Sequence, residues 1–543
     1  MTNRRTFLKQ ASLLATTPAA AVLARAQAPE KSGQNFVVAE TAFGKIRGEE
    51  VQGIKIFKGV PYGASTAGQN RFMPPMDPAP WGGVRDALHY GPSTPQSNPG
   101  VPRTVSALST ASASLPPESE DCLVLNVWTP ALKDGRKRPV LFWCHGGGFV
   151  SGSGSSPGTD GANLARRGDV VVVTINHRLN VLGFTYLAEF GGSDFASSGD
   201  AGMLDIVHAL RWVRNNIEQF GGDPNTVMIF GQSGGGRKVG TLLAMPSAKG
   251  LFHRAVIESG PTIKLVEIGD ATGVAAMLLA KLNLSTGQVR ELQKVPVERL
   301  MSAYFSVVKD MGNRDQMTEG FSPTVDEKAI PKHPFHPAAS PISADVPLML
   351  GSTRTEMTLL SDESAFSLDE PGMRARVKGI AGAESEALID LYRKLNPRAT
   401  PPDIYFLIAS DYRYGAPIMK IAERRAALGK GAVHLYYFTW ETPVQGGRLH
   451  SPHTMEIPFA FDNVQISRGL TGGGADAMAL ADKLSETWIA FARTGDPNTS
   501  KLPQWPAFNA KDRPTMVINN ESKVVSDPIR EQRIAMFRAL NLA

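Results

Sequence analysis

The chain has 543 residues with 57 basic and 51 acidic side chains, which gives a formal net charge of +6. Four basic residues and no acidic residue lie in residues 1–26, so removing that segment leaves a charge near +2. The sequence contains no basic run and no stripe of alternating basic and aromatic residues. Charge therefore argues against a nucleic-acid partner, despite the high isoelectric point.

Residues 1–26 have the pattern of a twin-arginine export signal. Asn3-Arg4-Arg5-Thr6-Phe7-Leu8-Lys9 precedes a modest apolar stretch, and Ala24-Arg25-Ala26 offers a small-x-small cleavage site before Gln27. The alternative is an uncleaved anchor, but the stretch is too short and too rich in Ala and Thr to span a bilayer well. The sequence predicts a bacterial protein that is periplasmic or secreted, without stable membrane insertion after cleavage.

The first part of the remaining chain reads as strands and loops. Residues 36–60 alternate short strand-like runs with glycine turns, which predicts an N-terminal β-meander. A loop-rich segment follows, with a low-complexity stretch at 101–117. Nearly continuous apolar runs at 123–128, 139–144 and 170–175 then indicate strands of a sheet that is covered on both faces.

A helix is expected next, at about residues 201–220. Leu204, Val207 and Leu210 supply its apolar face, and Gly221-Gly222-Asp223-Pro224 ends it. Further strands are predicted at residues 227–230, 254–258, 346–350 and 433–438. Residues 262–320 look helical and amphipathic, and we expect them to form a cap or lid region.

The clearest chemical motif is Gly231-Gln232-Ser233-Gly234-Gly235, which follows the predicted strand at 227–230. Strand, tight turn and helix form the context in which a Gly-x-Ser-x-Gly pattern marks a nucleophile. Small neighbours suit a strained turn, and the N-terminus of the following helix favours developing negative charge. The alternative is a glycine-rich turn with an incidental serine, which this context disfavours. Ser233 is the candidate nucleophile.

A candidate oxyanion hole lies upstream, at His145-Gly146-Gly147-Gly148-Phe149. Glycines after a strand let backbone N–H groups turn toward a tetrahedral oxyanion. The loss of one such donor typically costs about 3 to 4 kcal/mol of transition-state stabilisation. The alternative is a flexible loop, but a glycine triplet between His and Phe is the lipase and esterase pattern.

Serine needs a base, and the base needs a carboxylate that fixes its tautomer. Two histidines in the loop after strand 433–438, His450 and His453, are equal candidates on position alone. Glu356 follows the strand that ends at Leu350, but Asp326 and Glu363 are also available. The residues by themselves leave both choices open.

Taken with Glu356 and His453, the chain order is nucleophile, acid, base, which is the order of the α/β-hydrolase fold. The motifs run from residue 145 to residue 453, so a domain boundary between them would split the site. We therefore expect one domain over residues 27–543, with a large, mostly parallel central sheet, helices on both faces and helical cap insertions.

Neither cysteines nor histidine pairs indicate another kind of site. Cys122 and Cys144 lie in apolar strand-like runs, which favours buried thiols over a bridge. His333-Pro334-Phe335-His336 could suggest a metal site, but no carboxylate or further histidine is clearly spaced to join it. We expect neither a metal nor an organic cofactor.

The whole pattern resembles the type-B carboxylesterases, the family of bacterial p-nitrobenzyl esterases, animal carboxylesterases and cholinesterases. Ordered matches run from about residue 44 to residue 506. They include Phe57-Lys58-Gly59-Val60-Pro61-Tyr62, Ser119-Glu120-Asp121-Cys122-Leu123, Asn176-His177-Arg178, Phe220-Gly221-Gly222-Asp223-Pro224, the serine motif and Thr494-Gly495-Asp496-Pro497-Asn498.

The resemblance implies specific roles. The family's acid falls on Glu356, and its histidine precedes a segment like Glu456-Ile457-Pro458-Phe459, which selects His453 over His450. Its oxyanion donors fall on the residues Gly147, Gly148 and Gly234. The family pattern also implies ion pairs Arg71–Glu120 and Arg178–Asp205, and a supporting role for Ser259.

The chain also departs from the family pattern. Gln232 and Gly234 stand where the family more often has Glu and Ala, and neither change removes a group that the mechanism needs. Arg237 and Lys238 occupy positions usually held by small residues; we expect Arg237 to pair with a buried acid rather than to select a negatively charged substrate. The choline-binding tryptophan would fall near Ser112, in a stretch without aromatics, which argues against a cholinesterase.

The sequence thus predicts an exported serine carboxylesterase that hydrolyses small-molecule esters through an acyl-enzyme. Two alternatives remain: a lipase or amidase that uses the same triad, and a non-catalytic binding member of the superfamily. The natural ester and the oligomeric state are left open by the sequence.

Overall fold

The computed structural model describes residues 35–99, 117–312 and 319–542. The predicted export signal and residues 101–116 of the low-complexity stretch lie outside the described residues. The chain divides into two compact units, Met1–Asn35 and Phe36–Ala543, and the second unit is described by itself below.

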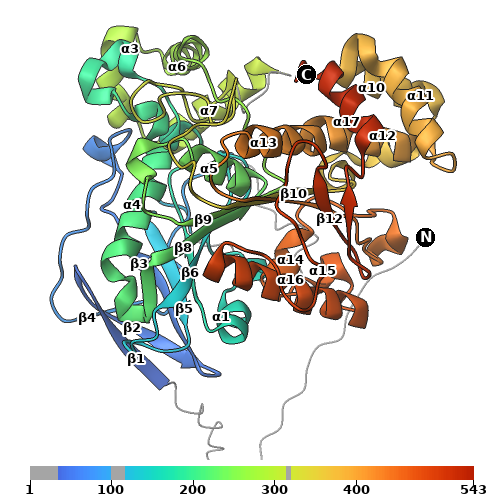
Figure 1. Ribbon diagram of the computed structural model, residues 1–543. Coiled ribbons are helices and arrows are strands. Elements are labelled where there is room, and N and C mark those ends of the chain that lie inside the picture. The colour runs from blue at the N-terminus through green and yellow to red at the C-terminus, as the bar shows by residue number, and fades with distance from the viewer. Residues whose placement is uncertain (1–34, 100–116, 313–318, 543) are drawn as a thin grey trace, which may run out of the picture. The chain divides into compact units, whose positions relative to one another are not determined.

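One large sheet organises this unit (Figure 1). Its strands are β1 (Asn35–Thr41), β2 (Gly44–Val51), β3 (Ile54–Pro61), β4 (Val84–Asp86), β5 (Val124–Thr129), β6 (Arg138–Cys144), β7 (Val171–Ile175), β8 (Gly222–Gln232), β9 (Arg254–Glu258), β10 (Leu348–Thr353), β11 (Val433–Phe438), β12 (Pro514–Ile518) and β13 (Lys523–Ser526). Their order is β1-β2-β3-β5-β7-β6-β8-β9-β10-β11-β12-β13, and β4 pairs with β2.

The α-helices are α1 (Ala162–Gly168), α2 (Asn180–Gly183), α3 (Ala188–Gly191), α4 (Ala201–Asn216), α5 (Gly234–Leu242), α6 (Ile268–Lys281), α7 (Val297–Met311), α9 (Met357–Leu360), α10 (Glu370–Ala381), α11 (Ser385–Leu395), α12 (Pro401–Ser410), α13 (Ala416–Ala426), α14 (Glu456–Ala460), α15 (Arg468–Thr471), α16 (Ala475–Thr494) and α17 (Arg530–Ala539). A π-helical turn, Asp411–Gly415, joins α12 to α13.

The centre of the sheet is parallel and its margins are mostly antiparallel, although β4 pairs with β2 in parallel. Consecutive strands within the series β7-β6-β8-β9-β10-β11-β12 pair in parallel. The pairs β2–β3, β3–β5, β5–β7 and β12–β13 are antiparallel. The predicted β-meander, the central strands and the helix at 201–220 are confirmed, the last of these as α4 followed by a 3₁₀ turn.

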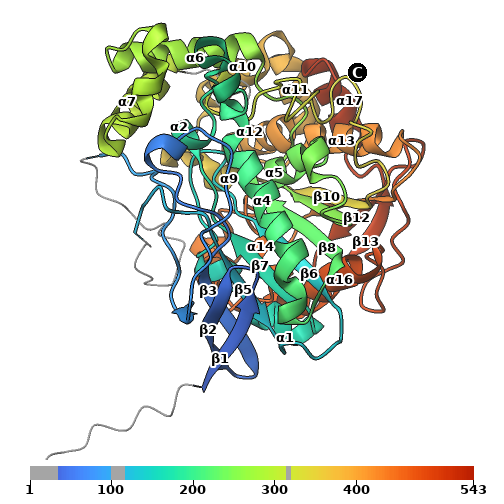
Figure 2. The same cartoon turned by 90° about the vertical axis from the view of Figure 1, so that its left-hand side faces the viewer.

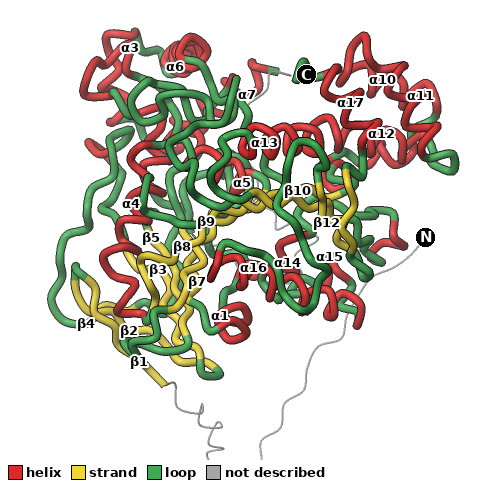
Figure 3. Tube along the Cα trace, in the orientation of Figure 1, coloured by secondary structure: helices red, strands yellow, loops and turns green. Residues whose placement is uncertain are grey.

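Each face of the sheet packs against its own set of helices (Figure 3). Along β6, Val140 and Phe142 belong to the hydrophobic cluster that includes residues of α4, α5 and α13. Leu141 and Trp143 alternate with them and join the cluster of α1, α14 and α16. Because successive side chains of a strand point to opposite faces, a continuous apolar run is what a doubly covered strand requires.

The predicted helical region at 262–320 contains α6, a 3₁₀ segment and α7. Figures 1 and 2 show α6 and α7 at the end of this unit that lies away from the β1–β2 meander. No helix within the described ranges is both long and apolar enough for a membrane span.

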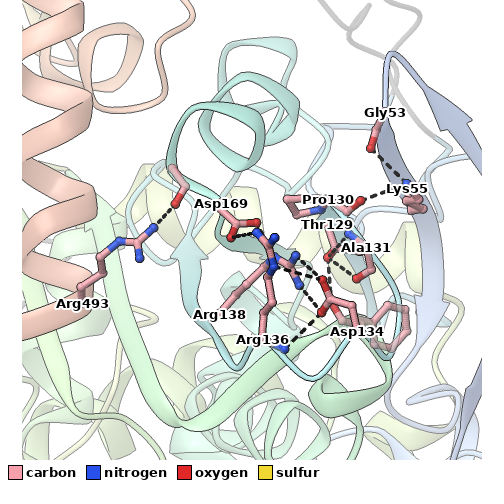
Figure 4. Close-up of polar contacts among 12 residues, drawn as sticks. Gly53, Lys55, Thr129, Pro130, Ala131, Asp134, Arg136, Arg138, Asp169 and Arg493 are labelled. Atoms are coloured by element: carbon pink, nitrogen blue, oxygen red, sulfur yellow. Dashed lines mark hydrogen bonds and ion pairs between the residues drawn. The ribbon is translucent and has the colours of Figure 1, made fainter.

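An ionic network ties the N-terminal end of β6 to α1 (Figure 4). Arg138 is buried, and its guanidinium donates to Asp134 at 2.5 and 2.6 Å and to Asp169 at 2.6 Å. Arg493 of α16 donates to the carbonyl of Gly168 at the end of α1. These contacts lie at the edge of the sheet opposite to the C-terminal end of β8, where the serine motif begins.

Both predicted ion pairs are present. Arg71 contacts Glu120 at 2.6 Å, and Arg178 contacts Asp205 of α4 at 2.6 Å. The side chains of Arg178 and Asp205 are 2% and 0% exposed, and three N–H groups of Arg178 donate to this carboxylate. Cys122 and Cys144 are buried and free, as predicted.

We expect Asp205→Asn to lower the thermal midpoint of unfolding strongly. The substitution leaves the Arg178 charge buried without its counter-ion, and breaking such a pair costs about 3 to 5 kcal/mol. Differential scanning calorimetry at a fixed scan rate measures the change. The exposed pair Arg47–Asp86 is the control, because Asp86→Asn should leave the midpoint nearly unchanged. Equal effects of the two substitutions would contradict the prediction.

Candidate active site

Ser233 lies in a strained turn between β8 and α5. Its φ and ψ are 57° and −122°, a region that residues other than glycine seldom occupy. The Ser233 N–H donates to the carbonyl of Glu258 in β9 at 2.8 Å, and its own carbonyl accepts from the Arg237 N–H at 3.0 Å. Because Ser233 is only half-buried, the turn presents its hydroxyl at the C-terminal edge of the sheet.

The glycines around the serine are required by close approach of the backbone. A Cβ atom at Gly235 would lie 2.0 Å from the carbonyl oxygen of Cys144 in β6. A Cβ atom at Gly231 would lie 2.6 Å from the same oxygen. The first turn of α5 therefore packs directly on the end of β6, and this contact draws the serine and the glycine triplet together.

Three backbone N–H groups are available beside the serine. Gly147 and Gly148 have φ values of 86° and 63°, and a Cβ at Gly147 would lie 2.4 Å from the Ser151 carbonyl oxygen. A Cβ at Gly234 would lie 2.3 Å from the Gly148 nitrogen, so these two backbones abut. Within the described ranges, the N–H groups of Gly147, Gly148 and Gly234 form no hydrogen bond. They can therefore receive a developing oxyanion.

Glu356 and His453 meet in a buried contact. Glu356 Oε2 lies 2.5 Å from His453 Nδ1, and Glu356 Oε1 accepts from the Thr353 N–H at 2.8 Å. Both side chains are almost fully buried. The carboxylate fixes the proton on Nδ1 and leaves Nε2 as the basic nitrogen.

The serine hydroxyl and His453 are not hydrogen-bonded to each other in the described structure. The side-chain nitrogen of Gln232 instead lies 3.3 Å from both ring nitrogens of His453. An equal distance to both nitrogens places the amide beside the ring rather than on one lone pair. Catalytic hydrogen bonds are often long without substrate and tighten when it binds.

The other candidates for the base and the acid have different partners. His450 is flanked by Asp403 at 3.5 Å and Glu441 at 3.6 Å, and hydrogen bonds to these two carboxylates raise the pKa of His450 to about 9. Asp326 accepts from two backbone N–H groups of its own loop, and Glu363 forms an exposed ion pair. The structure brings Glu356, and none of these carboxylates, to His453.

Two buried ionisable residues near the site were not foreseen as functional. Glu258 ends β9 and accepts a hydrogen bond from Trp488 Nε1 at 2.7 Å. Lys238 of α5 is fully buried, and its Nζ donates to the His145 carbonyl at 2.8 Å. A charged residue within a segment that otherwise reads as buried strand or helix is the sequence signal that could have singled them out.

Lys238 supports the loop that carries the glycine triplet. Burial lowers the pKa of Lys238 to about 7, so the side chain changes charge near neutral pH. Burial also lowers the pKa of His145 and of His177, whose rings stack with centroids 5.0 Å apart. Arg237, the neighbour of Lys238, is half-buried, and the expectation that it pairs with a buried acid stays a prediction.

Over the described ranges, no three His, Cys, Asp or Glu side chains lie close enough to hold a metal ion. His333 contacts Glu267 at 2.8 Å through Nε2 and accepts from the Leu265 N–H through Nδ1. Both of its nitrogens are therefore engaged.

Comparison with known proteins identifies the family. Residues 35–537 match the family described as "Carboxylesterase family". The chain belongs to the carboxylesterase family. Para-nitrobenzyl esterase of Bacillus subtilis (strain 168) is 34% identical over 504 residues, covering 92% of this chain and 98% of that protein. Phenmedipham hydrolase of Pseudarthrobacter oxydans is 34% identical over 508 residues, with the same two coverages.

Solved structures support the same family assignment. The Geobacillus stearothermophilus carboxylesterase EST55, in its crystal structure at pH 6.2, has a TM-score of 0.79 and 37% identity, covering 92% of this chain and 99% of that one. The predicted α/β-hydrolase fold and the resemblance to carboxylesterases are confirmed. The chain is therefore an enzyme that hydrolyses carboxylic esters, and its substrates are small molecules.

Lys238→Met tests the buried amine. An unfolded lysine has a pKa of about 10.4, so between about pH 7 and pH 10 the unfolded state binds more protons than the folded state. The charged amine therefore destabilises the fold below pH 7, and this penalty fades as the pH rises. We expect the methionine variant to gain most in thermal midpoint at about pH 6 and to lose that gain progressively between about pH 7 and about pH 10. A gain that grows with pH would contradict the assignment.

Proposed function

We propose that this carboxylesterase is exported and cleaves esters through an acyl-enzyme on Ser233. The observation that carries the proposal is the 2.5 Å contact between Glu356 and His453, close to a strained serine turn with unengaged N–H donors. The arrangement has the three parts of nucleophilic catalysis: a nucleophile, a base with a fixed tautomer and a site for the oxyanion.

In this mechanism His453 Nε2 removes the Ser233 proton while the serine oxygen attacks the acyl carbon. The negative charge that develops on the carbonyl oxygen is held by the N–H groups of Gly147, Gly148 and Gly234. His453 then gives its proton to the leaving alcohol, and the acyl group stays on Ser233. The same histidine activates a water molecule that releases the acid and restores the serine.

The alternatives are less well supported. A non-catalytic binding member would not need the buried Glu356–His453 contact or the strained serine, and both are present. A lipase or amidase would use the same machinery and differ in its substrate pocket. The name of the para-nitrobenzyl esterase suggests esters of aromatic alcohols as a first substrate class for this chain.

Ser233→Ala should abolish hydrolysis of p-nitrophenyl esters, with kcat lower by a factor of about 10⁶. Initial rates across acyl chains from acetate to palmitate separate a carboxylesterase, which prefers short chains, from a lipase. A rapid burst of p-nitrophenol in the unaltered enzyme would report the acyl-enzyme. Ser302→Ala, an exposed serine on α7, is the control and should keep full activity. Activity that survives in Ser233→Ala would refute the nucleophile.

Export is tested by the paired substitution Arg4→Lys and Arg5→Lys. We expect the unaltered protein to leave the cytoplasm and to begin at Gln27, as read by N-terminal sequencing. The variant should accumulate in the cytoplasm with its first residues retained, and its esterase activity in cell lysate should persist. Unchanged distribution between cytoplasm and periplasm would remove the twin-arginine assignment.

A further inference from the structure

Two further buried glutamates, Glu258 and Glu456, accompany Glu356 of the proposed catalytic pair. Glu258, Glu356 and Glu456 are each 0% exposed. Glu258 is the last residue of β9, where it pairs in register with Gln232 of β8 and Gly351 of β10. Its carbonyl accepts the Ser233 N–H. The backbone of Glu258 therefore frames the serine turn, and its side chain enters the layer between the sheet and α16.

The carboxyl groups of Glu258 and Glu456 are incompletely paired. Glu258 Oε1 accepts from Trp488, whereas Glu258 Oε2 is buried without a partner in the described structure. Glu456 Oε1 accepts from the Ser259 hydroxyl, and the Tyr436 hydroxyl lies 3.4 Å away; Glu456 Oε2 also has no partner there. Buried carboxylates normally have several donors or a cation, so these two cannot both carry a charge easily.

The titratable groups that interact with Glu258 are Glu456 of α14 and Tyr436 of β11, and each of these two also feels the charge of Glu356. Burial raises the pKa of Glu258 to about 7. Burial, and then the charges of Glu356 and Glu258, raise the pKa of Glu456 well above its usual range. Burial also raises the pKa of Tyr436, which stays neutral. Glu456 therefore holds its proton to higher pH than an ordinary glutamate, and Glu258 changes its charge near neutral pH.

Two sets of contacts connect Glu258 to the segment that carries His453. Ser259 follows Glu258 directly and hydrogen-bonds to Glu456, and Glu456 lies three residues after His453 at the start of α14. Gln232, the neighbour of Glu258 across the strands, has its amide 3.3 Å from the His453 ring. A charge at Glu258 is therefore enclosed with the imidazole in one water-poor layer, where electrostatic interactions are strong.

We propose that Glu258 is a positioning residue for His453. The ionised carboxylate of Glu258 stabilises the imidazolium that forms when His453 takes the serine proton. The inference rests on the proposed acyl-enzyme mechanism. Glu258 loses its proton to solvent before the reaction and exchanges none with substrate, so the catalytic proton still passes only between Ser233, His453, the leaving alcohol and water. A purely structural role would instead be limited to the hydrogen bond with Trp488.

Glu258→Gln separates the two roles. A negative charge raises the pKa of a nearby imidazole, so its removal should move the acid limb of the kcat/KM profile for p-nitrophenyl butyrate to lower pH, by up to about one unit. It should also lower kcat at about pH 8 by roughly tenfold, with KM within about twofold, because a weaker base is left. A structural role would alter the thermal midpoint and leave the pH profile where it was.

Trp488→Phe provides the matched variant. It retains Glu258 but removes the donor that favours the ionised carboxylate, so the pKa of Glu258 should rise and the acid limb should extend to higher pH. In the Glu258→Gln background the same change should leave the pH profile unaltered. If Glu258→Gln does not fold, the shift of the acid limb to higher pH in Trp488→Phe tests the role of Glu258 by itself.

The inference is overturned if Glu258→Gln and the unaltered enzyme have the same pH profile. It is also overturned if Trp488→Phe shifts the profile equally in both backgrounds, or not at all in the unaltered one. Activity that is independent of Ser233 would instead refute the proposed mechanism, so the two failures are distinguishable. Supporting results are opposite shifts from the two single variants and no further shift in the double variant.

Discussion

The hydrogen bond from the Ser233 N–H to the Glu258 carbonyl fixes the serine turn to the sheet. The next strand repeats this contact, because the Ser259 N–H donates to the Gly351 carbonyl of β10. From β10 the chain reaches Glu356, whose carboxylate accepts the Thr353 N–H and contacts His453. Residues far apart in the sequence thus take their positions from one register of parallel strands, and a slip of one residue would turn every side chain to the wrong face.

Exclusion of water is the second condition of the site. Glu356, Glu456 and Lys238 are all fully buried, and each charge removed from water costs free energy unless it is paired. The two hydrophobic clusters on either face of the sheet offset that cost. A site assembled in this way holds its dipoles and charges fixed before substrate arrives, which is the arrangement that favours transition-state stabilisation.

The sequence predicted those features that depend on residues close together in the chain. Apolar runs gave the central strands, glycines that a close backbone approach requires marked the serine turn, and the fold class followed from the motif order. The choice between His450 and His453 could not be made locally, because it depends on Asp403 and Glu441 lying beside one and Glu356 beside the other. The charge of Glu258 within a strand segment was a local signal, but its partner Trp488 could not be found locally because it is 230 positions away.

The state of the two cysteines has a consequence for how the protein can mature. Cys122 and Cys144 are the whole thiol content of the chain, and both are unpaired within the core. Burial raises the pKa of each thiol to about 12, so neither forms the reactive thiolate at physiological pH. The fold therefore needs no oxidant and no disulfide isomerase, and it can be completed in a reducing compartment.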